Sequence, residues 1–77
     1  GTEVDILLDT GQKLIACEVK SGSTFQSSFV QSLSAASEKL ARPGVEVLKR
    51  LVYGGDAPMS YLGVEVIPWN QIAKFDW

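Results

Sequence analysis

Aliphatic and β-branched residues, the residue types that favour β-strands, are concentrated in two stretches in the first part of the chain. This character runs from Glu3 to Asp9, stops at Thr10-Gly11, and resumes from Lys13 to Lys20. Two such stretches around a short glycine-containing turn predict a β-hairpin. Alternate side chains of the second stretch point to opposite faces. One face carries Leu14, Ala16, Glu18 and Lys20, and the other carries Ile15, Cys17 and Val19.

From Ser23 onward the spacing of apolar residues changes to that of a helix. Five of them follow at intervals of four, four, three and four residues: Phe25, Phe29, Leu33, Ala36 and Leu40. This stripe predicts an amphipathic helix of about 17 residues with one buried side. We expect Ser23 or Thr24 to cap its N-terminus and Pro43-Gly44 to end it.

The remaining sequence predicts two more strands and a short helix. One strand covers about Val47 to Tyr53 and ends at a Gly54-Gly55-Asp56 turn, and the other covers about Gly63 to Pro68. We expect Asn70 to cap the final helix. The order ββαββα predicts an α/β domain, a four-stranded mixed sheet with one main helix packed on one face.

Length and composition limit the chain to one small domain over residues 1–77. Of its 77 residues 45% are hydrophobic, and no apolar run approaches the roughly 18 residues needed to cross a bilayer. We therefore expect a soluble domain without membrane contact. A net charge of -2 does not favour non-specific binding to phosphate backbones. Any contact with nucleic acid must be local or supplied by another domain.

The cysteine and histidine content excludes two kinds of site. The single Cys17 cannot form an internal disulfide, and the absence of His excludes a zinc site of the usual Cys/His type. An unpaired thiol favours a reducing, cytoplasmic location. The chain starts at Gly1 without Met and enters a strand pattern at once, so we expect it to be a piece of a longer protein.

Three ionisable residues share one face of the predicted hairpin. A two-residue loop pairs Glu3 with Glu18, and a four-residue loop pairs Asp5 with Glu18; both place Asp5, Glu18 and Lys20 together. A three-residue loop without a bulge separates them. Opposed Cβ atoms in a sheet lie about 4.5–5.5 Å apart, so two carboxylates there repel each other unless they share a cation.

A divalent cation suits such a pair of acids. Mg²⁺ or Mn²⁺ is held by one or two carboxylates, with Mg²⁺ at about 2.0–2.1 Å, together with water and substrate phosphate. Asp5 and Glu18 are the expected metal ligands, the Val19 carbonyl is a further one, and Glu3 is an additional acid beside the site. Such a metal activates water for attack on phosphorus, and Lys20 is placed to orient that water or neutralise developing charge.

The same residues carry a family resemblance. Asp5 precedes the Glu18-Val19-Lys20 run by thirteen residues across a hairpin that leads into a helix. This arrangement resembles the restriction-endonuclease-like, or PD-(D/E)xK, nuclease superfamily, which implies that Asp5 and Glu18 bind metal and Lys20 is catalytic. The run EVDILLDTGQKLIACEVKSG, followed by a helix, LVYGGD and GVEVIPW, is similar to the C-terminal domain of a large group of prokaryotic AAA+ type ATPases of poorly defined role. This similarity covers nearly the whole chain.

The chain departs from these relatives in two ways. The superfamily's helix before the first motif strand is missing, and no Walker A loop is present. Both departures fit a C-terminal fragment of a longer ATPase, in which ATP binds only to an upstream domain.

The candidate residues also have plainer structural roles. Glu18 and Lys20 can form an ordinary ion pair on an exposed strand face, and Asp5 can lie on the solvent side of an edge strand. The Ser21-Gly22-Ser23 segment can offer backbone N–H groups to a phosphate, or it can serve only as a turn and helix cap. Cys17 fits a buried thiol.

Three functional hypotheses follow. The leading one is a metal-dependent phosphodiesterase module that cleaves DNA with Asp5, Glu18 and Lys20. The second is a non-catalytic accessory domain of the ATPase that docks partners or DNA, with the acids as relics. The third is a truncated domain that oligomerises through the sheet surface that its missing helix would have covered.

Overall fold

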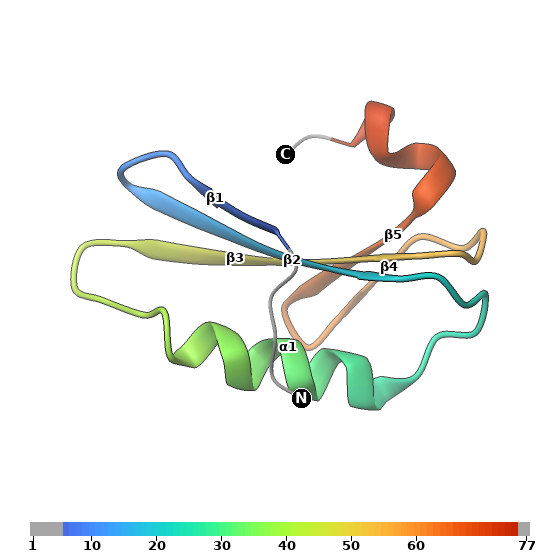
Figure 1. Cartoon of the computed structure of the whole chain (residues 1–77), viewed down its shortest axis with the longest axis horizontal. Helices are drawn as coiled ribbons and strands as arrows, with labels where there is room; N and C mark the ends of the chain where they lie inside the picture. Colours follow the sequence, from blue (N-terminus) through green and yellow to red (C-terminus); the bar gives the residue numbers. More distant parts are fainter. Residues whose placement is uncertain (1–5, 76–77) are drawn as a thin grey trace.

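The computed structural model describes residues 6–75 (Figure 1). The elements in chain order are β1 (Ile6–Asp9), β2 (Lys13–Lys20), α1 (Ser27–Glu38), β3 (Glu46–Tyr53), β4 (Met59–Tyr61), β5 (Val64–Pro68) and the 3-10 helix η1 (Trp69–Lys74). The strands form one sheet in the order β1-β2-β3-β5-β4. β2, β3 and β5 are parallel, whereas β1 and β4 are antiparallel to their neighbours. Figure 1 shows α1 on one face of the sheet and η1 on the other.

The predicted hairpin is confirmed, and its register is that of a four-residue loop. Asp9 pairs with Leu14, so four residues, 10–13, lie between these two partners, and β2 already begins at the last of them. The Thr10 N–H donates to the Lys13 carbonyl at 2.9 Å, and the Gly11 N–H donates to Asp9 Oδ1 at 2.8 Å. Gly11 has a φ of 92°, a left-handed conformation that glycine adopts without steric cost. This is the register for which the sequence predicts Asp5 opposite Glu18.

The core lies between α1 and the sheet. Ala16 of β2, Leu33 of α1 and Leu51 of β3 are fully buried there. The helical stripe expected from the sequence supplies the covering layer, since Leu33 and Ala36 are buried and Phe25, Phe29 and Leu40 pack against this core or its rim. A smaller cluster on the other face joins Cys17, Val52 and Ile67 to Phe75 beyond η1. The prediction of a buried Cys17 thiol is confirmed.

α1 is shorter than predicted, and its predicted N-caps are wrong. The helix begins at Ser27, with Gln26 at the N-cap position and no side-chain hydrogen bond there. The Gly54 N–H donates to the Gly22 carbonyl at 2.8 Å and ties the preceding segment to the loop after β3. This tertiary bond holds residues near Ser23 away from the helix start, so their capping preference is not used. The helix also ends at Glu38, before Pro43.

The predicted count of four strands is wrong, because the sheet has a fifth strand, β4. Its three residues pair antiparallel with β5, with Met59 opposite Val66 and Tyr61 opposite Val64. Leu62 and Gly63, both with positive φ, make the tight turn between the two strands. So short a segment with mostly exposed side chains has no strand pattern of its own and depends on its partner.

The final helix is a 3-10 helix that starts at Trp69, and Asn70 does not cap it. Pro68 occupies the N-cap position, and no side chain bonds to the helix start. Pro68 is also the last residue of β5 and is fully buried, so sheet and helix meet without a linker. Among residues 6–75, no helix is long and apolar enough to span a membrane.

Candidate functional site

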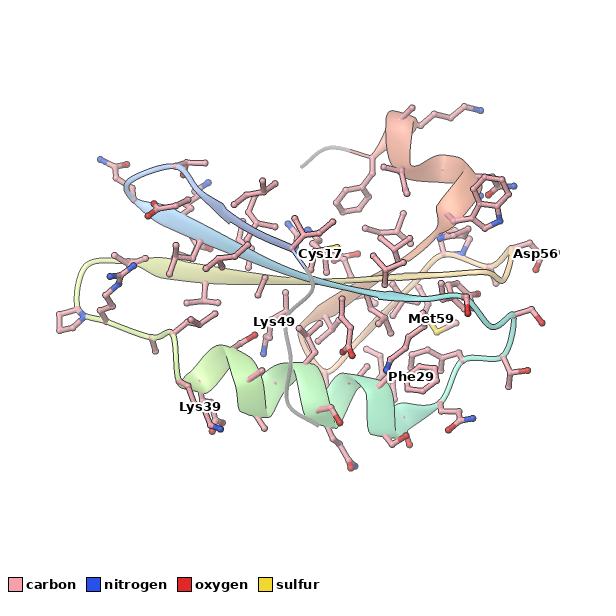
Figure 2. All side chains as sticks on the ribbon, viewed as in Figure 1. Cys17, Phe29, Lys39, Lys49, Asp56 and Met59 are labelled. Carbon is pink, nitrogen blue, oxygen red and sulfur yellow. The ribbon has the colours of Figure 1, made fainter. Side chains whose placement is uncertain are left out.

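Glu18 and Lys20 lie at the end of β2 on the face that α1 covers. The Lys20 ammonium is 3.0 Å from Glu18 Oε1, and it lies 5.0 Å from the centroid of the Phe29 ring. Figure 2 shows Phe29 projecting from α1 into the space below the sheet. The two charged side chains predicted to share a face are therefore in direct contact, with an aromatic ring beside the cation.

The Glu18 carboxylate is buried, and only one of its oxygens has a partner. The residue is 7% exposed, and Oε2 has no hydrogen-bond partner among the described residues. In the ladder Glu18 pairs with fully buried Leu51, so its surroundings are largely apolar. A buried polar atom without a partner costs about 1–3 kcal/mol, and more when it is charged. A cation or hydrogen-bond donor that reaches Glu18 Oε2 would remove this cost, so the site favours binding of such a group.

The other predicted ligands divide into two groups. Asp5 and Glu3 lie outside the described residues. Val19 follows Glu18 in β2, and the group predicted to bind metal is its backbone carbonyl; its side chain lies on the opposite face, where the residue is 47% exposed. Within residues 6–75 no three acidic, cysteine or histidine side chains lie close enough to hold a metal ion. The described part of the chain thus supplies one carboxylate oxygen, at Glu18, that suits a hard cation.

The Ser21-Gly22-Ser23 segment is held by two glycines that the sequence assigned only to a turn. A Cβ atom on Gly54 would lie 2.5 Å from the Ser21 carbonyl oxygen, and one on Gly55 would overlap the Tyr53 ring and lie 2.8 Å from the Ser23 carbonyl oxygen. The facing loop requires glycine at position 54, and the Tyr53 ring and that loop together require it at position 55. The paired glycines in the sequence were the available signal, but the neighbouring backbone that explains them becomes visible only in the fold.

These loops lie at the carboxyl ends of the parallel strands. Lys20, Tyr53 and Pro68 are level with one another across β2, β3 and β5. The Tyr53 hydroxyl donates to the Ala57 carbonyl at 2.7 Å and accepts from the Ala57 N–H at 3.1 Å, which fixes the loop after β3. Ligands of open α/β sheets bind at this end of the strands. Lys20 therefore stands where the topology favours a binding site.

The opposite face of the sheet has a different character. An open hollow of about 230 Å³ lies there between β1, β2 and η1. Its lining contains no charged side chain and consists of Ile6, Leu8, Cys17, Val19, Val52 and Ile72. The ionic pair and the apolar hollow thus occupy opposite sides of the same strand, β2.

Residues 1–72 match the protein family described as Domain of unknown function (DUF4143), and the chain belongs to this family. Such a domain is typically the C-terminal domain of AAA-ATPase-associated proteins. No curated protein and no solved structure matches the chain significantly.

Proposed function

We propose that this domain is the nuclease-like C-terminal module of an AAA+ type ATPase and cleaves DNA phosphodiesters with a divalent metal. The single observation that carries the proposal is the buried Glu18 carboxylate, whose Oε1 binds Lys20 while its Oε2 has no described partner. Burying a carboxylate oxygen that has no hydrogen-bond partner costs stability, and a small domain has little to spare. A cation that binds Oε2 would remove this cost.

The expected metal ligands are Glu18 Oε2 and the carboxylate of Asp5, with the carbonyl of Val19, the residue after Glu18, as a further ligand and Glu3 as an additional acid. The four-residue hairpin loop supports this set, because it is one of the two loop lengths that bring Asp5 and Glu18 to a shared face. Mg²⁺ or Mn²⁺ bound there supplies a Lewis acid that activates water and stabilises charge on phosphorus.

Lys20 has the role of a positioned cation in this proposal. Its ammonium is held between Glu18 Oε1 and the Phe29 ring, and its side chain is 36% exposed. It therefore reaches solvent while remaining anchored, which suits a group that orients water or neutralises a phosphate oxygen. The Ser21-Gly22-Ser23 segment beyond it is the proposed phosphate contact, and the ATP of the parent protein binds elsewhere.

The direct test is metal-dependent cleavage of plasmid DNA by the full-length protein. Glu18→Gln and Asp5→Asn should abolish cleavage, and Lys20→Met should reduce it at least a hundredfold, since a lost catalytic group typically costs that much. Lys13→Met, at the exposed start of the same strand, is the matched control and should leave the rate unchanged. Cleavage that survives Glu18→Gln and Asp5→Asn would show that this site is not the catalyst.

Metal binding can be measured separately from DNA cleavage, by NMR. Adding Mn²⁺ should broaden the NMR signals of residues around Glu18, and the broadening should disappear in Glu18→Gln. The exposed Asp56 provides a control, because Asp56→Asn should leave the effect intact. Equal broadening in both variants would rule out a metal at Glu18.

A second function is favoured by the ion pair itself. The 3.0 Å contact between Lys20 and Glu18 is also what a structural ion pair looks like, and no three-ligand cluster exists within residues 6–75. In that case the domain is a non-catalytic accessory module that docks partners or DNA, or that oligomerises. Saturable DNA binding by the full-length protein, unchanged by Glu18→Gln and without cleavage, would support this second function.

A further inference from the structure

β1 forms an open edge of the sheet with exposed apolar residues on both faces. It is the first strand in the sheet order and pairs only with β2 among the described strands. Its aliphatic residues Ile6, Leu7 and Leu8 are 46%, 48% and 45% exposed. Because consecutive side chains point to opposite faces, apolar surface is exposed above and below this edge. A strand of this kind is the usual acceptor of another strand.

The hairpin shows which backbone groups of β1 point outward. In an antiparallel ladder, hydrogen-bonded and non-bonded pairs alternate. The Thr10 N–H donates to the Lys13 carbonyl in continuation of the β1–β2 register. The even-numbered residues of β1 therefore bond to β2. The N–H and C=O groups of Leu7 and Asp9 point away from the sheet and are open to an incoming strand.

The side chains of β1 alternate between the two faces of the sheet in the same way. Leu7 and Asp9 lie on the α1 face, level with Ala16 and Leu14, whereas Ile6 and Leu8 line the apolar hollow on the other face. A strand that complements this edge needs apolar residues toward the hollow and a basic residue toward Asp9.

The β1 strand of a second copy of the chain does not supply a basic residue opposite Asp9. Two β1 strands that pair antiparallel through their outward groups must match odd-numbered positions with odd-numbered positions. Pairing Leu7 with Leu7 sets Asp9 against position 5, which is Asp5 in the sequence. A shift by one step sets Leu7 against Asp9, so that a carboxylate lies opposite an apolar side chain, and a second step sets Asp9 against Asp9. None of these registers pairs Asp9 with a basic residue, so a second copy complements this edge poorly.

We propose that β1 is a docking edge for an extended partner segment in which basic and apolar residues alternate. The segment bonds to the backbone of Leu7 and Asp9. Its apolar side chains cover Ile6, Leu8 and the hollow, and its basic side chains face Asp9. The inference is independent of the proposed nuclease activity, because neither Glu18 nor Lys20 takes part.

The test is residue-resolved amide hydrogen exchange by NMR, with a short peptide of alternating lysine and valine as the probe. The peptide should slow exchange at Leu7 and Asp9 at least tenfold and leave Ile6 and Leu8 unchanged, since these two already bond to β2. A matched peptide of alternating glutamate and valine should have no effect. Unchanged exchange at Leu7 and Asp9, or equal effects of the two peptides, would overturn the proposal.

Two variants separate backbone pairing from charge. Leu7→Pro removes the outward N–H, which an edge strand tolerates, and should abolish peptide binding while the Leu8 amide stays protected. Asp9→Asn keeps an oxygen for the Gly11 N–H and should weaken the peptide about threefold at low salt. Glu46→Gln, an exposed acid on β3, is the matched control and should change nothing. Protection that appears without peptide and grows with protein concentration would identify a second copy instead and overturn the proposal.

Discussion

The two faces of β2 invert the usual relation between residue type and burial. On the face toward α1 a carboxylate, Glu18, is only 7% exposed, whereas on the other face its neighbour Val19 is 47% exposed. α1 runs beneath the first face and covers whatever side chain lies there. η1 covers only part of the second face, because it follows β5 and reaches the sheet beside β3 and β5. Burial in this domain therefore depends on which layer covers a position, more than on the side chain at that position.

The largest expected effect concerns the covered face. Leu33→Ala removes a fully buried side chain between α1 and the sheet and should lower the free energy of unfolding by about 3 kcal/mol. Ile72→Ala is the matched change on the open face, where the side chain is 40% exposed, and should cost less than about 1 kcal/mol. Urea denaturation measures both. Equal losses would mean that the two faces are packed alike.

The second largest effect on stability is expected where Gly54 contacts the loop after β2, at the carboxyl end of the parallel strands. Gly54→Ala places a methyl group against the Ser21 carbonyl and should destabilise the domain by about 2 kcal/mol. Gly22→Ala, in the facing loop, meets no atom within 4 Å and should be neutral or stabilise by up to about 1 kcal/mol. Thermal unfolding distinguishes them. If Gly54→Ala were harmless, the two loops would not be in close contact in solution.

The ion pair on the covered face should be sensitive to which partner is removed. Lys20→Met keeps the aliphatic stem on Phe29 but leaves Glu18 buried without a cation, and should cost about 1.5 kcal/mol. Glu18→Gln removes the buried charge itself and should cost less than Lys20→Met. Lys13→Met, exposed on the same strand, should change stability by less than about 0.5 kcal/mol. A larger loss for Glu18→Gln than for Lys20→Met would mean that the carboxylate is stabilised by something other than Lys20.

The smallest effect is expected on the open face. Val19→Thr keeps the side-chain shape at an exposed position and should change the free energy of unfolding by less than about 0.5 kcal/mol. Val52→Thr, at a position in the same hollow that is 2% exposed, should cost about 1–2 kcal/mol because its hydroxyl is buried. Similar costs for both, measured by denaturation, would show that Val19 is covered in solution.

Several elements could be predicted because their signals are local. The strand Lys13–Lys20 is found with the predicted bounds, and the helical stripe through Leu33 lies on the core as expected. Period-two and helical spacings are properties of the chain itself, so they survive whatever neighbour the element acquires. The sharing of one face by Glu18 and Lys20 was predictable for the same reason.

Other features could not be predicted, because a distant segment decides them. β4 is a strand only because Met59–Tyr61 lies along β5. The start of α1 moves to Ser27 because the backbone at Gly22 is bonded to Gly54, more than thirty residues away in the chain. Capping propensities at Ser23 and Thr24 are worth about 1 kcal/mol, which a tertiary contact easily outweighs.

The candidate site shows the same division. By itself the sequence determined that Glu18 and Lys20 stand two positions apart on one side of a strand, that a hairpin precedes them and that a helix follows. Only the tertiary structure decided that α1 covers this side, that one oxygen of Glu18 binds Lys20 and the other has no described partner, and that Gly54 contacts the neighbouring loop. Alternation along a strand is set by covalent geometry, whereas burial and pairing depend on which segments pack together.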